Sequence, residues 1–213
     1  MSAREAILGA LRAGRALTPP ALPALVALRN LPVAERVARF SAVLTKVGGV
    51  VERCHDIAAA LRRAGELLDA AGARSVATSD ARELAALPSN LASDVRVVPH
   101  DAPRAELLAA DAGVTMAQWG IAETGTLVLV SACEQHRLAS LLPPLHVALL
   151  PVDRLLGGFD EALAVLRGPA AGPPASRTIT FVTGPSRTAD IELELVVGVH
   201  GPKALHVLLV GPG

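Results

Sequence analysis

The sequence predicts an α/β fold in which a mainly parallel sheet carries helices on both faces and includes an antiparallel hairpin. From Pro32 onward, segments with apolar residues at helical spacing alternate with short β-branched runs, which is the order typical of βαβ units. The run over residues 145–150 is almost entirely apolar, as expected for a strand buried on both faces. The 213 residues are 51% hydrophobic and 19% charged, which excludes a disordered chain and allows one sizeable core.

An N-terminal arm is expected before this domain. Residues 2–14 place apolar side chains at helical spacing, and the proline-rich stretch over 18–23 cannot continue a helix. We therefore expect residues 1–31 to form an N-terminal helical arm and Pro-rich linker, packed on the core or on a neighbouring copy in a homo-oligomer. Residues 32–213 are expected to form a single α/β domain.

Helices and strands alternate through the first half of this domain. Pro32 suits the first turn of a helix, and the residues after it place an apolar stripe on one helical face. That stripe consists of Val33, Val37, Phe40, Val43 and Leu44. The elements expected next are a strand over 49–53, a helix over 57–71 closed by Gly72, a strand over 75–78, a helix-like segment over 81–86, a strand over 95–98 and a helix over 105–110.

A hairpin interrupts the parallel pattern in the second half. Residues 114–119 and 125–131 are expected strands, and the connection over 120–124 is too short for a parallel crossover. The two strands are therefore expected to be antiparallel. The remaining elements are expected to be a strand over 145–150, a helix over 155–166, a loop over 168–176, a strand over 178–183 and a strand over 205–210.

The composition excludes two classes of protein. The formal net charge is zero, aromatic residues make up 2% and there is no Tyr, so the basic face and stacking surfaces of a nucleic-acid-binding module are missing. The apolar run over 138–152 contains Pro143, Pro144 and Pro151, which break it before it could span a bilayer. No secretory signal is visible before Arg12, so a cytoplasmic protein is expected.

The two cysteines bear on the cofactor. Cys54 and Cys133 lie far apart in the sequence, and neither belongs to a CxxC pair. Two cysteines cannot supply the four thiolates of an ordinary iron–sulfur cluster, so no such cluster is expected in this chain. The phosphate loop GxxxxGK[ST] and a strand-linked GxGxxG are also missing from the sequence. The identity of any other cofactor stays open.

Two loops are the predicted ligand site. Residues 184–192 follow the expected strand over 178–183 and combine turn formers, hydroxyls, two carboxylates and Arg187, whose guanidinium can meet a carboxylate or phosphate. Residues 122–126 form the second loop, and the rule that ligands bind at the carboxyl ends of strands places the two loops together. The predicted ligand-binding residues are Thr124, Gly125, Thr126, Gly184, Ser186, Arg187, Thr188 and Asp190, and no metal site is predicted.

The same loops carry a resemblance to the LutC/YkgG family of LUD-domain proteins. The runs that resemble family signatures are Gly-Ile-Ala-Glu-Thr-Gly-Thr at 120–126, Leu-Pro-Pro-Leu-His at 142–146, the nine residues at 184–192 and Gly-Val-His-Gly-Pro at 198–202. The resemblance implies a LUD-like domain over 32–213 with a fold similar to the NagB/RpiA/CoA-transferase group. It also implies a clusterless component of a lactate utilisation system, which supports oxidation of L-lactate to pyruvate beside iron–sulfur partner proteins.

Several residues keep two interpretations. CoA transferases of the similar fold use a glutamate nucleophile, so Glu123 is either a catalytic residue of an acyl- or CoA-transferring enzyme or a hydrogen-bonded structural residue. His200 is either an acid, base or ligand donor, or a turn histidine bonded to backbone. Arg187 either binds an anion or pairs with Asp190 or Glu192. At the level of the whole chain, the alternative is a non-catalytic assembly or regulatory subunit whose function lies in an interface.

Overall fold

The fold is described from a computed structural model. It describes residues 2–13, 31–135, 137–171, 178–189 and 195–212. The helix predicted for residues 2–14 is confirmed as α1 (Ala3–Ala13). Part of the predicted linker, residues 14–30, lies outside the described residues, so the division into arm and domain stays a prediction.

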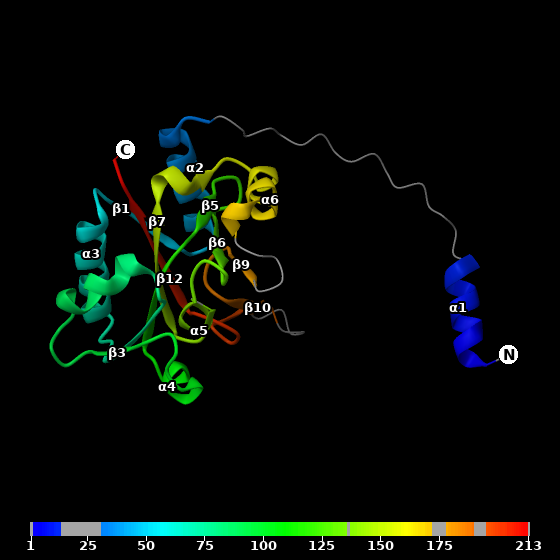
Figure 1. The fold of residues 1–213 in the computed structure, drawn as a ribbon, viewed down its shortest axis with the longest axis horizontal. Helices are drawn as coiled ribbons and strands as arrows, with labels where there is room; N and C mark the ends of the chain where they lie inside the picture. Colours follow the sequence, from blue (N-terminus) through cyan, green and yellow to red (C-terminus); the bar gives the residue numbers. More distant parts are fainter. Residues whose placement is uncertain (1, 14–30, 136, 172–177, 190–194, 213) are drawn as a thin grey trace.

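A six-stranded parallel sheet, sheet A, forms the centre of the domain (Figure 1). Every neighbouring pair in it is parallel, and the register runs from Val50 opposite His206 at one edge to Ala77 opposite Val98 at the other. In spatial order the strands are β1 (Val50–Cys54), β12 (Ala204–Val210), β7 (Leu145–Pro151), β4 (Ala112–Met116), β2 (Ser75–Thr78) and β3 (Arg96–Val98). The predicted mainly parallel sheet is confirmed.

A second sheet, sheet B, contains the predicted hairpin. Its central strands are antiparallel, with Trp119 opposite Val128. The spatial order is β8 (Leu155–Leu156), β5 (Trp119–Ile121), β6 (Thr126–Val130) and β9 (Ile179–Val182). A short antiparallel pair, β10 (Arg187–Ala189) and β11 (Leu195–Val197), lies apart from both sheets.

The single strand predicted over residues 114–119 is wrong in one respect, because the chain changes sheets inside it. The amide of Ala117 donates to Leu149 O in sheet A, whereas the next amide, of Gln118, donates to Val128 O in sheet B. Residues before this point therefore belong to β4 and residues after it to β5. The hairpin is not an insertion into sheet A but the centre of its own sheet.

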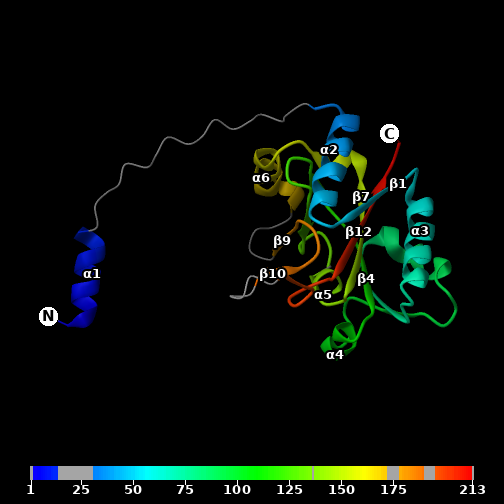
Figure 2. The same cartoon turned by 180° about the vertical axis from the view of Figure 1, so that it is seen from behind.

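Helices cover both sheets in layers (Figures 1 and 2). Buried residues of α3 (Ile57–Ala70) and of the 3₁₀ segment η1 (Arg82–Asn90) pack on one face of sheet A. The helix α2 (Val33–Lys46) and sheet B pack on the other face, and α6 (Phe159–Arg167) covers the outer face of sheet B. The domain is thus an α/β sandwich with an additional sheet inside it.

Local chemistry explains where these helices begin. Asp56 caps α3 by accepting a hydrogen bond from the amide of Ala59, and the helix then buries Leu61 and Leu68. The helix predicted from residue 155 begins only at Phe159, because Leu155 and Leu156 pair with β5 instead. The shorter elements are α4 (Arg104–Leu108), α5 (Arg137–Leu141), η2 (Val152–Arg154) and η3 (Pro169–Ala171). No helix in the described part of the chain has the length and apolar character needed to cross a membrane.

Candidate functional site

The two loops predicted as the ligand site meet at the end of α2. Gly125 has φ +63°, and a Cβ added to it would lie 2.7 Å from the amide nitrogen of Leu44. A Cβ added to Gly184 would lie 3.0 Å from Cγ2 of Val47. The hydroxyl of Thr126 lies 2.7 Å from that of Thr183, next to Gly184, so the predicted proximity of the loops is observed. Both glycines permit close approach of backbone to helix.

These loops lie at the amino edge of sheet A, not at its carboxyl edge. The helix that they contact leads directly into the start of β1. The amide of Ser186 donates to Pro202 O, just before the start of β12. The expectation of carboxyl-end loops was wrong for sheet A, because residues 178–183 and 119–121 contribute strands to sheet B. The rule for open parallel sheets does not extend to that sheet.

Polar groups of the predicted site are engaged within the chain. Arg187 Nη2 donates to the carbonyl oxygen of Val47 at 2.6 Å, and so satisfies a carbonyl at the C-terminus of α2. The hydroxyl of Thr124 lies 2.7 Å from that of Thr126. The backbone of Thr188 belongs to β10, whereas Asp190 and its predicted pairing with Arg187 lie outside the described residues.

The two predicted catalytic residues are held differently. Glu123 Oε2 accepts a hydrogen bond of 3.0 Å from the amide of Phe159, at the start of α6. A carboxylate in this place compensates for Gly158, which caps that helix without a side chain. His200 is exposed in the turn after β11. The hydrogen bond from the amide of Phe159 is the kind of contact expected if Glu123 is a structural residue.

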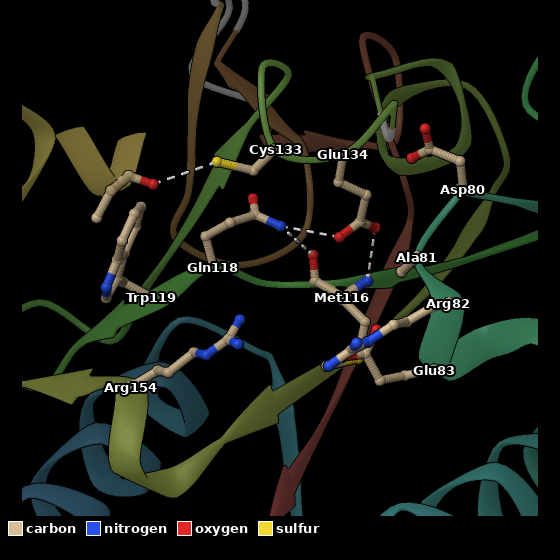
Figure 3. Close-up of a pocket in the computed structure, with 11 residues that line it drawn as sticks. Asp80, Ala81, Arg82, Glu83, Met116, Gln118, Trp119, Cys133, Glu134 and Arg154 are labelled. Carbon is tan, nitrogen blue, oxygen red and sulfur yellow. Dashed lines mark hydrogen bonds and ion pairs between the residues drawn. The ribbon is translucent and has the colours of Figure 1, made fainter. Parts of the chain in front are cut away.

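A cavity of about 600 Å³ lies at the opposite edge of sheet A (Figure 3). It opens beyond the carboxyl ends of β2 and β4, which are neighbours in the sheet. From β2 the chain continues to β3 on one side, and after β4 it reaches β7 on the other. This divergence is a topological switch point, where open α/β sheets bind ligands. The lining residues are Asp80, Ala81, Arg82, Glu83, Met116, Gln118, Trp119, Cys133, Glu134, Arg154 and Ala170.

Glu134 is the buried acid of this cavity. Only 4% of the residue is exposed, and its Oε1 accepts a hydrogen bond of 2.9 Å from the amide of Met116. Its Oε2 accepts a second bond, of 2.8 Å, from Nε2 of Gln118. Gln118 is itself fixed, because its Oε1 accepts a 2.6 Å bond from the amide of Val130. The carboxylate is therefore oriented by groups from both sheets, at the point where the chain crosses between them.

Burial alters the ionisation of this acid. Desolvation raises the pKa of Glu134 to about 7, although hydrogen bonding by the side chain of Ser79, the amide of Met116 and the side chain of Gln118 acts in the opposite direction. The negative charge of Asp80 raises the pKa further. At neutral pH the cavity thus contains a carboxyl group that takes both protonation states. A titratable group of this kind in a cavity is characteristic of functional sites.

Two arginines supply the positive charge. Figure 3 shows the guanidinium groups of Arg82 and Arg154 directed from opposite sides toward one space below Gln118 and Met116. The Nε of Arg82 lies 3.6 Å from Oε1 of Glu83, a pair at the solvent-exposed rim. Among the residues that the structure describes, Arg154 pairs with no carboxylate. Forked donors that face a common space are suited to a small carboxylate.

The residues of this cavity are not among those predicted from the sequence, although the sequence contains a signal for some of them. Ser79 and Asp80 directly follow the strand predicted over 75–78, which is a true parallel strand. The carboxyl-end rule, applied to this strand, leads to Asp80 and Arg82. No comparable signal marks Glu134, since it follows a strand of sheet B and reaches the cavity only through the folding of both sheets.

Comparisons with known proteins place these observations in context. A family model described as LUD domain matches residues 37–210. The chain is similar to lactate utilization protein C of Shouchella clausii, with 35% identity over 153 residues, covering 68% of this chain and 66% of that protein. Lactate utilization protein C of Bacillus licheniformis and an uncharacterized protein of Neisseria meningitidis serogroup B are each 41% identical over 102 residues, covering 47% and 48% of this chain. These matches span less than half the length of the latter two relatives, 42% and 43%.

A solved structure is similar over most of the fold. It is a DUF162 family protein from Deinococcus radiodurans with a TM-score of 0.63 and 25% sequence identity. The alignment covers 85% of this chain and 99% of that one. The α/β architecture derived above is therefore shared with an experimentally determined protein.

Proposed function

This chain belongs to the LUD domain family, and from that premise we propose that it is a component of a lactate utilisation system. The observation that carries the proposal is its similarity to proteins named lactate utilization protein C, which reaches two thirds of the chain in one of them. Its role would be to support oxidation of L-lactate to pyruvate in the cytoplasm. With two cysteines in its sequence, the chain would rely on partner proteins for iron–sulfur chemistry.

Within that system, we propose that the chain binds a small carboxylate in the cavity at the carboxyl edge of sheet A. Three features support this site: the switch-point position, the two converging guanidinium groups and the apolar surface offered by Met116 and Trp119. The loops over 122–126 and 184–190 are the second candidate for anion binding. They are disfavoured by the bond between Arg187 and Val47, which a ligand would have to replace.

Isothermal titration of L-lactate into matched arginine variants tests this assignment. Arg154→Ala should weaken lactate binding by about ten- to hundredfold, the usual range for the loss of a charge-assisted hydrogen bond. Arg187→Ala is the control and should leave the affinity unchanged, while it removes the bond at the end of α2. Weaker binding in Arg187→Ala with unchanged binding in Arg154→Ala would instead assign the ligand to the loops over 122–126 and 184–190. Failure of lactate, pyruvate and phosphate to bind the wild-type protein would contradict the proposal.

An assembly role is the second candidate function, and one observation favours it. On α1, Ile7 is 60% exposed and Leu8 is also exposed, so this helix presents apolar side chains that another protein can cover. Deleting residues 1–31 should then abolish co-purification with iron–sulfur partner proteins, measured by size-exclusion chromatography after co-expression. The affinity for lactate should survive the deletion. Unchanged complex formation would remove the assembly role of the arm.

A transferase using Glu123 is the third alternative. The hydrogen bond from the amide of Phe159 to Oε2 of Glu123 supports a structural role instead, because it ties the carboxylate to the start of α6. Incubation with an acyl-CoA followed by mass spectrometry is the direct test of this alternative. An adduct on Glu123 would establish it.

A further inference from the structure

Glu134 occupies an unusual place among the polar groups of the cavity. Arg82, Glu83 and Arg154 lie at exposed positions or at the rim, whereas Glu134 is almost completely buried and still lines the cavity. Figure 3 shows it above Gln118 and Met116, with the arginines on the far side of these two residues. Glu134 and the two arginines therefore line different sides of one cavity.

The surroundings of Glu134 determine what it can recognise. Oε1 accepts from the amide of Met116, Oε2 accepts from Nε2 of Gln118, and the side chain of Ser79 also acts on this carboxyl group. An ionised carboxylate has about four acceptor positions, so capacity remains for a further donor. Gln118 cannot turn its amide around, because its oxygen is bound to the amide of Val130 and its nitrogen also faces Met116 O at 3.3 Å. A rotated side-chain amide would place Nε2 of Gln118, a donor, against the N–H donor of Val130. When it is ionised, above its pKa of about 7, Glu134 therefore presents only hydrogen-bond acceptors toward the cavity.

A ligand that satisfies both ends of the cavity needs two different groups. A carboxylate suits Arg82 and Arg154, and a hydrogen-bond donor elsewhere on the ligand suits Glu134. A small apolar substituent can lie against Met116 or Trp119, which line the same space. A 2-hydroxy acid combines these features on adjacent carbon atoms. The corresponding 2-oxo acid offers a second acceptor in place of the donor and would face the carboxylate unfavourably.

We propose that Glu134 is a specificity-determining residue that accepts a hydrogen bond from the 2-hydroxyl of a bound hydroxy acid. Gln118 acts as a positioning residue, since its Nε2 holds the carboxylate while its own Oε1 is fixed by the amide of Val130. This inference rests on the proposed carboxylate site. It adds that Glu134 determines which small carboxylates this site prefers. Sites that hydrogen-bond a substrate hydroxyl reject analogues lacking it, because a buried polar group then stays unpaired.

Four ligands of nearly equal size test the proposal: L-lactate, pyruvate, propionate and L-alanine, titrated by ligand-observed NMR at about pH 8.5, where Glu134 is ionised. The wild-type protein should bind lactate about ten- to hundredfold more tightly than propionate or pyruvate. In Glu134→Gln this preference should fall to about threefold or less, while propionate binding persists. Glu35→Gln is the control, since it removes an exposed carboxylate of α2 outside the cavity and should retain the lactate preference.

The outcomes separate this inference from the proposed function. Absence of binding by all four ligands overturns both, whereas equal binding of lactate and propionate overturns only the role of Glu134. A preference that survives in Glu134→Gln, or tighter binding of alanine than of lactate, also overturns the hydroxyl assignment. Occupancy of the cavity is measured independently by the maleimide reactivity of Cys133, which is exposed in the cavity wall, whereas Cys54 is buried. Lactate should slow this reaction, and unchanged reactivity would place the ligand elsewhere.

Discussion

Replacing Gly125 by alanine should lower the free energy of unfolding by about 2–5 kcal/mol, because two separate costs add. The residue has φ +63°, a conformation that costs an alanine about 1–2 kcal/mol. The new Cβ would also lie 2.7 Å from the amide nitrogen and 3.0 Å from Cα of Leu44. Both atoms are helix backbone, so the hairpin or α2 must shift, at about 1–3 kcal/mol.

Gly72→Ala provides the matched control for this prediction. Gly72 has φ +67°, close to that of Gly125, and a Cβ added there meets nothing within 4 Å. This variant should lose only the conformational part, about 1–2 kcal/mol. Urea unfolding followed by the fluorescence of Trp119, the single tryptophan, measures both variants. Equal losses in the two variants would show that the hairpin does not pack tightly on α2.

The second large effect is a dependence of stability on pH that originates at Glu134. Its pKa is about 7 in the folded protein and 4.5 in the unfolded chain, so the folded state holds a proton that the unfolded state releases. The resulting stabilisation is complete below pH 4.5 and is lost as the pH rises to about 7. Its size is on the order of 3 kcal/mol, from the free energy equivalent of one pKa unit.

Comparison with Glu134→Gln isolates this contribution. Glutamine has no proton to release, so the difference in unfolding free energy between wild type and variant should favour the wild type most near pH 4.5 and decline up to pH 8. Urea titrations at several pH values between these limits provide the measurement. Glu83→Gln controls for the general removal of a carboxylate. Parallel curves for wild type and Glu134→Gln would mean that Glu134 is not a buried acid of raised pKa.

Much of the fold could be predicted from the sequence because its strongest signals are local. The apolar run over 145–150 forms β7 at the centre of sheet A, and the short connection over 120–124 correctly indicated an antiparallel hairpin. The transfer of the chain between sheets could not be predicted. The amide of Ala117 bonds to sheet A and the next amide, of Gln118, bonds to sheet B, and no turn-forming residue marks the change. Periodicity reports burial and does not report which sheet a strand joins.

The candidate site was less predictable, because the sequence does not show which of the two sheets a strand joins. The rule of carboxyl ends was sound, but it was applied to strands that belong to sheet B, and it led to the loops beside α2. The proximity of those loops was predicted and is observed. The raised pKa of Glu134 has no counterpart in the sequence, because it arises from burial between Met116 and Gln118.

The position of β12 has a consequence for how the domain acquires its structure. This strand lies between β1 and β7, and it is the strand that joins β1 to the rest of sheet A. Val50 pairs with His206, so almost the whole domain separates the two partners along the chain. During synthesis, β1 has no β12 to pair with until residues 204–210 have been made. Contacts so distant in sequence are associated with slow folding and with a period in which an apolar edge is open to aggregation.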